Sequence, residues 1–271
     1  MMARLGTVCR IGFRMGFFVT GLSLAIGAGL ARSETCVLSA QHVGMTFAVD
    51  QIEADWTCRL SSIIGNYTTA NKLGPVSTPL PESVYLYLLD HPVMTAALVN
   101  RLGIAPYQSE SRGPARYWGN DGEGTEGIVQ LLAQDRSSRI YYLEGSHDSL
   151  VLRRITGKGV VLLKINRTVD SHGMEVMEST LVSYTRLDNR FFAGIASLFR
   201  PLAGRAVTKR LMKGVESVNR LSQAMRQEPD RVLSEAMKLP ALLPDELIFL
   251  KQVLASLDHS GSAVPARVVA P

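Results

Sequence analysis

The chain has 271 residues, of which 46% are apolar and 20% are charged, with 23 glycines and 12 prolines. This composition can supply a hydrophobic core and excludes a disordered or collagen-like polymer. The formal net charge is +5, but four arginines and no acidic residue lie in the first 33 residues. The rest of the chain is therefore nearly neutral, and nucleic acid is not an expected partner.

Three cysteines without metal-ligand spacing argue against zinc modules, and no phosphate-loop glycine pattern is present. No metal and no cofactor are therefore expected.

The first 33 residues have the layout of an export signal. Three arginines precede the apolar run of residues 15–31, which ends in small residues of the kind that a signal peptidase recognises. Cleavage after Ala31 and cleavage after Ser33 are both acceptable, and an uncleaved membrane anchor is the alternative. We therefore expect residues 1–33 to be a signal peptide and the protein to be periplasmic or secreted.

Export changes the expectation for the cysteines, because a disulfide persists in an oxidising compartment. Cys9 leaves with the leader, so Cys36 and Cys58 remain as an even pair. A bridge between them would close a segment of about 23 residues and contribute about 3 kcal/mol by the loop-entropy estimate. Two unpaired thiols are the alternative.

Residues 34–80 show no sustained period and end in a proline-rich stretch, which indicates an irregular, wrapping segment. Residues 82–89 and 93–102 repeat apolar side chains at helical spacing on either side of a His-Pro break, so two short helices in tandem are predicted. The following stretch, to residue 188, is divided by turn-forming clusters such as NDGEG, QDRSS and TGKG. This spacing predicts about six antiparallel strands, near residues 105–118, 126–134, 138–145, 149–155, 159–167 and 174–187.

After the strands, apolar residues return to helical spacing and continue to Pro229. Pro201 is expected to kink this helix or to begin a new one, so the long element is predicted over residues 202–227. Two shorter amphipathic helices follow within a helical extension over residues 229–258, and residues 259–271 have the composition of a disordered tail. The predicted fold class is α+β.

This order of elements is similar to that of the START-like helix-grip superfamily, which includes polyketide cyclase-like and lipid-transfer-like proteins. The resemblance covers residues 81–228 and rests on element order and on phrases such as YWGNDGEGTEGIVQLL, RIYYLEG and LVSYTRLDN. It implies a curved antiparallel sheet wrapped on the long C-terminal helix, around a cavity for lipids, sterols, polyketides or other apolar molecules. It also implies binding first, with catalysis only in some branches.

The chain departs from that superfamily in its leader, in residues 34–80 and in its extra C-terminal helices. The usual first strand is not evident, so it is expected from residues 37–49 or is missing.

A sheet with one helix on its concave face leaves room for a hydrophobic ligand such as a lipid. Residues of the last strand and the long helix are the candidate lining: Met174, Met177, Leu181, Tyr184, Phe191, Phe192, Phe199, Met212 and Met225. Ordinary core packing is the alternative for each of them.

The long helix also carries a basic stripe. Residues 190–226 contain eight basic residues and one acidic residue, and Arg205, Lys209 and Lys213 are spaced four apart on one face. Such a face suits an anionic membrane surface or a negatively charged partner, and a solvated face is the alternative.

His147 and Asp148 are the candidate catalytic pair, because a carboxylate can orient an imidazole for acid-base chemistry. The acidic glycine loop with Asp121, Glu123 and Glu126 lacks the spacing of a calcium site, so it is expected to be a flexible hairpin tip or an entrance flap.

The sequence therefore predicts an exported binding protein that sequesters or carries a hydrophobic, lipid-like ligand between sheet and helix. One alternative is a cyclase-type or hydrolase-type enzyme on the same scaffold, using His147. The other is a structural or interaction protein whose core is filled by its own side chains.

Overall fold

The structure is a computed structural model that describes residues 36–148, 154–171, 173–188, 196–239 and 242–261. The predicted signal peptide and the candidate residues Phe191 and Phe192 lie outside the described residues. Among those described, no helix has the length and apolar character needed to cross a membrane.

Residues 36–80 contain regular elements, although their sequence shows no sustained period. These elements are β1 (Gln41–His42), β2 (Met45–Thr46), the short 3-10 helix η1 (Val49–Gln51), α1 (Ala54–Gly65) and β3 (Thr69–Thr78). The usual first strand of the fold is thus present as β3, and it lies after residues 37–49 rather than within them.

An irregularity in the middle of β3 hides this strand from sequence analysis. The pairing of β3 with the last strand shifts register between Leu73 and Val76, so the alternation of side chains breaks there. Gly74 has a φ of 104°, and a Cβ at that position would lie 2.5 Å from the carbonyl oxygen of Ser179. The Gly74-Pro75 pair therefore resembles a linker although it lies inside a strand.

The two predicted tandem helices are confirmed, and they precede six more strands. The bounds are α2 (Glu82–Asp90), α3 (Pro92–Arg101), β4 (Gln108–Ser111), β5 (Arg116–Asn120), β6 (Thr125–Gln134), β7 (Ser138–His147), β8 (Ile155–Val169) and β9 (Glu175–Leu187). The predicted segment 105–118 contains β4 and the start of β5, whereas the segment near 149–155 overlaps only the beginning of β8.

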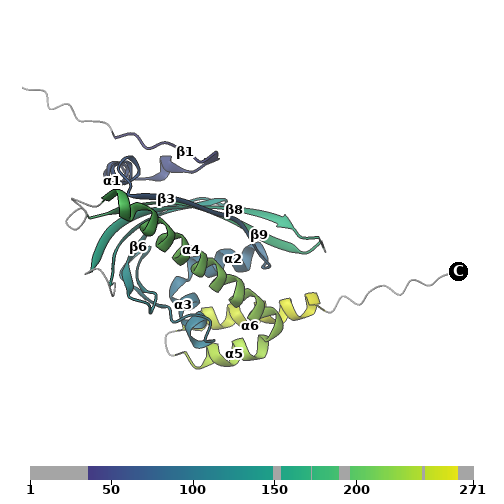
Figure 1. Cartoon of the computed structure of the whole chain (residues 1–271). Coiled ribbons are helices and arrows are strands. Elements are labelled where there is room, and N and C mark those ends of the chain that lie inside the picture. The colour runs from purple at the N-terminus through teal and green to yellow at the C-terminus, as the bar shows by residue number, and fades with distance from the viewer. Residues whose placement is uncertain (1–35, 149–153, 172, 189–195, 240–241, 262–271) are drawn as a thin grey trace, which may run out of the picture. The chain divides into compact units, whose positions relative to one another are not determined.

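The main sheet has seven strands in the order β3-β9-β8-β7-β6-β5-β4, and every neighbouring pair is antiparallel. The sheet curves around the long helix α4 (Ala196–Gln227), as Figure 1 shows. The predicted α+β class, with a curved antiparallel sheet and a long C-terminal helix, is therefore confirmed as a helix-grip arrangement.

The helix α4 ends at Gln227 as expected, but it begins earlier than predicted and runs through Pro201 without a break. It is followed by α5 (Pro229–Met237) and α6 (Pro244–Gly261). Prolines occupy the first positions of α3, α5 and α6, where a missing backbone donor costs nothing.

Two hydrophobic cores lie on the two faces of the sheet. On the concave face, residues of β8 and β9 pack with α2, α3, α5, α6 and the C-terminal half of α4. On the convex face, Phe47, Leu60 and Ile63 pack against Ile140 and Leu162 of the sheet. Both faces of the central strands are therefore buried, and residues 36–65 form the layer that covers the convex one.

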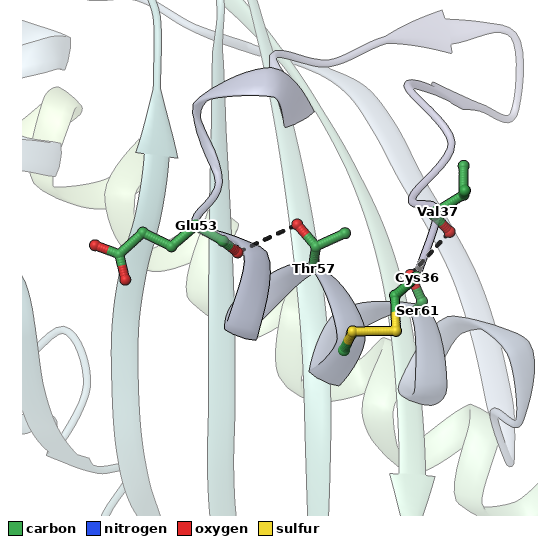
Figure 2. The surroundings of a disulfide bond; sticks show 6 residues. Cys36, Val37, Glu53, Thr57 and Ser61 are labelled. Atoms are coloured by element: carbon green, nitrogen blue, oxygen red, sulfur yellow. Dashed lines mark hydrogen bonds between the residues drawn. A yellow bond between two sulfur atoms is a disulfide. The ribbon is translucent and has the colours of Figure 1, made fainter. Parts of the chain in front are cut away.

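The predicted disulfide between Cys36 and Cys58 is confirmed, and it ties the start of the described chain to α1 (Figure 2). Beside the bridge, the hydroxyl of Ser61 donates a hydrogen bond to the carbonyl oxygen of Val37 at 2.9 Å. The bridge therefore fixes the covering layer at its N-terminal end.

Candidate ligand-binding cavity

A cavity of about 590 Å³ lies between the concave face of the sheet and the N-terminal half of α4. Every strand of the main sheet contributes to its wall, together with α3 and α4. Its apolar side chains include Pro92, Ala96, Val129, Leu143, Ile155, Val161, Leu187, Val207 and Leu211. A concave, largely apolar space with a few polar groups is typical of small-molecule binding sites.

A row of four glycines on the concave face creates this space. Gly119, Gly127, Gly145 and Gly157 pair with one another in register across β5, β6, β7 and β8, and all four line the cavity. Because glycine has no side chain, the row leaves a hollow where a sheet normally carries a layer of side chains.

The middle of the row also allows the strands to approach each other closely. A Cβ at Gly145 would lie 2.4 Å from the carbonyl oxygen of Glu126, and one at Gly127 would lie 2.5 Å from that of Glu144. At Gly119 the nearest atom would be the carbonyl oxygen of Gln108, at 3.8 Å. The close approach of β6 and β7 therefore requires glycine at positions 127 and 145. At position 119, by contrast, the missing side chain leaves open space in the cavity.

A second cavity of about 450 Å³ adjoins the first on the side of α2 and α3. The residues that line both cavities are Pro92, Ala96, Tyr107, Ser109, Gly119 and Val129. The hollow under α4 therefore continues beyond Tyr107.

The nine candidate lining residues lie elsewhere or are not described. Phe191 and Phe192 lie outside the described residues, as does the side chain of Phe199. None of the six described side chains lines either cavity, namely those of Met174, Met177, Leu181, Tyr184, Met212 and Met225.

Burial and strand alternation explain the positions of these six side chains. Met177 and Met225 are fully buried in the concave core beside the C-terminal half of α4, and Leu181 packs against that core. Tyr184 lies on the convex face, where its hydroxyl is 3.1 Å from Nδ1 of His42. The remaining two, Met174 and Met212, are exposed.

The candidate catalytic His147 is the last residue of β7. It lines the cavity beside the loop that joins β5 and β6. Its Nδ1 is 3.1 Å from the hydroxyl of Thr125 and 3.1 Å from Nη2 of Arg210, a residue of α4. Asp148 is bound through its backbone, because its N–H donates to the carbonyl oxygen of Gly124. Within the described part of the chain, the hydrogen bonds of the imidazole thus go to Thr125 and Arg210.

The acidic glycine loop is docked onto α4 by two ion pairs. Arg210 pairs with Asp121 at 3.3 Å, and Lys213 pairs with Glu123 at 2.7 Å. We call these four residues the latch, because they join the β5–β6 hairpin to α4 beside the cavity. No group of three or more potential metal ligands occurs in the described ranges.

The carboxylate of Asp121 has hydrogen-bond partners both on the hairpin and on α4. It accepts hydrogen bonds from the backbone N–H groups of Glu123 and Thr125, at 2.7 and 2.9 Å. Partial burial alone would raise the pKa of Asp121, but these bonds and the one from Arg210 outweigh it and hold the pKa below its usual value.

The latch predicts an acid-dependent loss of stability. Because the pKa of Asp121 is lower in the folded chain than in the unfolded chain, its contribution is complete above about pH 4 and is lost at more acidic pH. Asp121→Asn should therefore destabilise the protein by about 1–2 kcal/mol at pH 7, and by progressively less below about pH 4. Urea unfolding between pH 3 and pH 7 measures the difference.

Glu110→Gln is the matched control, because Glu110 forms an ion pair with Arg112 in which both side chains are exposed. Its effect should stay below about 0.5 kcal/mol at every pH. A penalty for Asp121→Asn that does not change with pH would contradict the assignment.

The expected basic stripe is shorter than its spacing suggests. Arg205 and Lys209 are exposed, whereas Lys213 is half-buried and takes part in the latch. The ammonium group of Lys213 also lies 5.9 Å from the centre of the Tyr107 ring. Of the three residues of this stripe, Arg205 and Lys209 are therefore the two that are fully available to solvent.

No protein-family model matches the sequence, and no curated protein matches it. Among solved structures, the chain is similar to a conserved protein from Geobacillus kaustophilus, with 8% identity and a TM-score of 0.41, over 57% of this chain and 93% of the other. It is also similar to Ara h 8.0201, with 11% identity and a TM-score of 0.30, over 58% of this chain and 99% of the other.

Proposed function

We propose that the protein binds and carries a hydrophobic small molecule, such as a lipid, in the cavity between the sheet and α4. The observation that carries this proposal is the apolar hollow of about 590 Å³ above the glycine row. At about 25 cal/mol per Å², a ligand that buries about 350 Å² of apolar surface gains about 9 kcal/mol before the costs of association. Because association costs at least about 4 kcal/mol, the net affinity is weaker than this gross gain alone would give.

Native mass spectrometry of the gently purified full-length gene product, combined with titration by a hydrophobic probe, tests the proposal. Diphenylhexatriene is a suitable probe because it is a hydrocarbon that fluoresces in apolar surroundings. We expect saturable binding of one probe molecule per chain. A protein that carries no ligand in native spectra and takes up no diphenylhexatriene would contradict a carrier function.

Export is part of the same proposal. It is supported by the arrangement of charged, apolar and small residues in 1–33 and by the disulfide between Cys36 and Cys58, since such bridges persist in oxidising compartments. The intact mass from the same experiment should correspond to a chain that begins at Arg32 or Glu34. A mass that includes the leader would contradict cleavage.

We also propose that Arg205 and Lys209 favour encounters with anionic membranes during ligand transfer. Both side chains are exposed and lie one helical turn apart on α4, whose other face borders the cavity. Each cation near an anionic surface contributes about 1 kcal/mol, and salt screens this attraction.

Reversing both charges tests this role. The double variant Arg205→Glu and Lys209→Glu should bind vesicles containing phosphatidylglycerol at least about tenfold more weakly at low salt. The control variant Lys72→Glu and Lys251→Glu makes the same charge change at two other exposed lysines. Vesicle co-sedimentation measures both, and equal losses would show a general charge effect instead of a binding face.

A further inference from the structure

Gly214 is a gap in the apolar stripe on the inward face of α4. The stripe consists of apolar residues that recur every three or four positions, as on one face of a helix: Val207, Leu211, Val218, Leu221 and Met225. Gly214 stands three residues after Leu211 and four before Val218, so it occupies the missing position. The inward face of α4 therefore lacks one side chain near the middle of the helix.

Neither the backbone nor the packing requires glycine at position 214. The residue lies inside the continuous helix α4 and does not have a positive φ. A Cβ there would meet no described atom within 4 Å, so no neighbouring element approaches closely. Glycine also destabilises a helix relative to alanine. An unfavourable residue that no neighbour requires indicates that the empty space beside it is used.

The empty space beside Gly214 is the second cavity, of about 450 Å³, which Gly214 lines. On the opposite side, the sheet contributes Tyr117 of β5, Leu131 of β6 and Tyr141 of β7, and Leu131 pairs in register with Tyr141. The lining as a whole consists mainly of apolar and aromatic residues. The second cavity therefore suits an apolar group, as the first one does.

The two cavities follow each other along α4. Val207 and Leu211 line the first cavity, whereas Gly214 and Val218 line the second. Tyr107 belongs to the wall of both. An apolar molecule that is longer than the first cavity therefore extends past Tyr107 into the second.

We propose that the second cavity is a further subsite for the same ligand, and that this ligand is an elongated molecule with a long alkyl chain that lies along α4. Gly214 keeps the second subsite open and so sets the length that is accepted. The inference rests on the proposed function and adds the shape and length of the ligand to it. Each additional methylene group that is buried should strengthen binding about fourfold.

Gly214→Leu tests the second subsite, because leucine would fill it and leave the first cavity unchanged. We measure the affinities of the full-length protein for decanol and hexadecanol by displacement of diphenylhexatriene. The variant should bind hexadecanol at least about thirtyfold more weakly than the wild type, because several methylene groups lose their site. Its affinity for decanol should change by less than about threefold, because the first cavity of about 590 Å³ still accepts this shorter molecule.

Gly65→Leu is the matched control, because it makes the same change at another helical glycine with no described atom within 4 Å of its Cβ. Gly65 lines neither cavity, so both affinities should equal those of the wild type.

Gly214→Ala tests the open space independently of ligand binding. It should raise the melting temperature of the ligand-free protein by about 1–4 °C, because alanine favours the helix and its methyl group meets no neighbour. A lower melting temperature would show that the space is already filled, and it would overturn the proposal even where Gly214→Leu does not fold.

The remaining outcomes separate the second subsite from the proposed function. Wild-type affinity for hexadecanol in a folded Gly214→Leu protein would overturn the second subsite. Equal losses for decanol and hexadecanol would overturn the assignment of length to Gly214. Two hexadecanol molecules per wild-type protein in native mass spectra would overturn the single elongated ligand. A wild-type protein that takes up no diphenylhexatriene would instead overturn the proposed function itself.

Discussion

Replacing Gly145 by valine is expected to destabilise the protein by about 3 kcal/mol or more. The new Cβ would lie 2.4 Å from the carbonyl oxygen of Glu126 and 3.0 Å from Cα of Gly127. Both contacts are with the backbone of the neighbouring strand, so no side-chain rotation relieves them. Urea unfolding followed by circular dichroism should show a lower midpoint for Gly145→Val, and the chain should fold poorly when expressed.

Gly119→Ala is the control for this prediction, because it changes a glycine of the same row in open space. Its Cβ would meet only the carbonyl oxygen of Gln108, at 3.8 Å. The change in stability should therefore stay below about 1 kcal/mol. Similar losses for Gly145→Val and Gly119→Ala would show that the close approach of β6 and β7 does not limit the choice of residue.

Gly119→Leu is expected to weaken the binding of hydrophobic molecules strongly while the fold is retained. Gly119 lines both cavities, and a Cβ there would meet only the carbonyl oxygen of Gln108, at an ordinary contact distance of 3.8 Å. A leucine there would occupy the hollow between the sheet and α4, where the ligand is proposed to lie. The affinity for diphenylhexatriene should fall on the order of a hundredfold, because the ligand and the leucine compete for the same volume.

Gly65→Leu makes the same chemical change at the end of α1, on the convex side of the sheet. A Cβ at Gly65 has no neighbour within 4 Å, so this control should bind the probe like the wild type. Undiminished binding by Gly119→Leu, in a protein shown to be folded, would mean that hydrophobic molecules bind elsewhere.

The elements that depend on local sequence patterns were predicted well. The two tandem helices, the strands of the β-rich middle and the end of α4 follow from periodicity and from glycine or proline at the boundaries. The strand β3 was missed because Gly74-Pro75 and the register shift beside it interrupt its alternation. Its place in the sheet depends on pairing with the distant strand β9, where Thr69 pairs with Thr185, and no local pattern reports such a contact.

The sequence predicted an apolar cavity between the sheet and the long helix, but it did not predict the residues that line this cavity. The candidates were chosen as large apolar residues, whereas the hollow results from missing side chains in the row of four glycines. Phrases that contain them, such as GEGTEG, YLEG and TGKG, are visible in the sequence. Their alignment into one row depends on the register of three strand pairs, which the sequence alone does not give.

The charged residues show the same difference between spacing and three-dimensional contact. The four-residue spacing of Arg205, Lys209 and Lys213 correctly places them on one helix, but it does not show that a distant hairpin neutralises Lys213. The pairing of Lys213 with Glu123 follows from the docking of the β5–β6 hairpin onto α4. The latch was therefore beyond sequence analysis, although both charged segments had been recognised.

A crystal structure with bromodecanol tests the central claim most directly, because anomalous scattering locates the bromine atom independently of any structural interpretation. We expect the bromine inside the cavity, among Val129, Leu143 and Val207. Bromine on the outer surface, or side chains filling the space between the glycine row and α4, would contradict it.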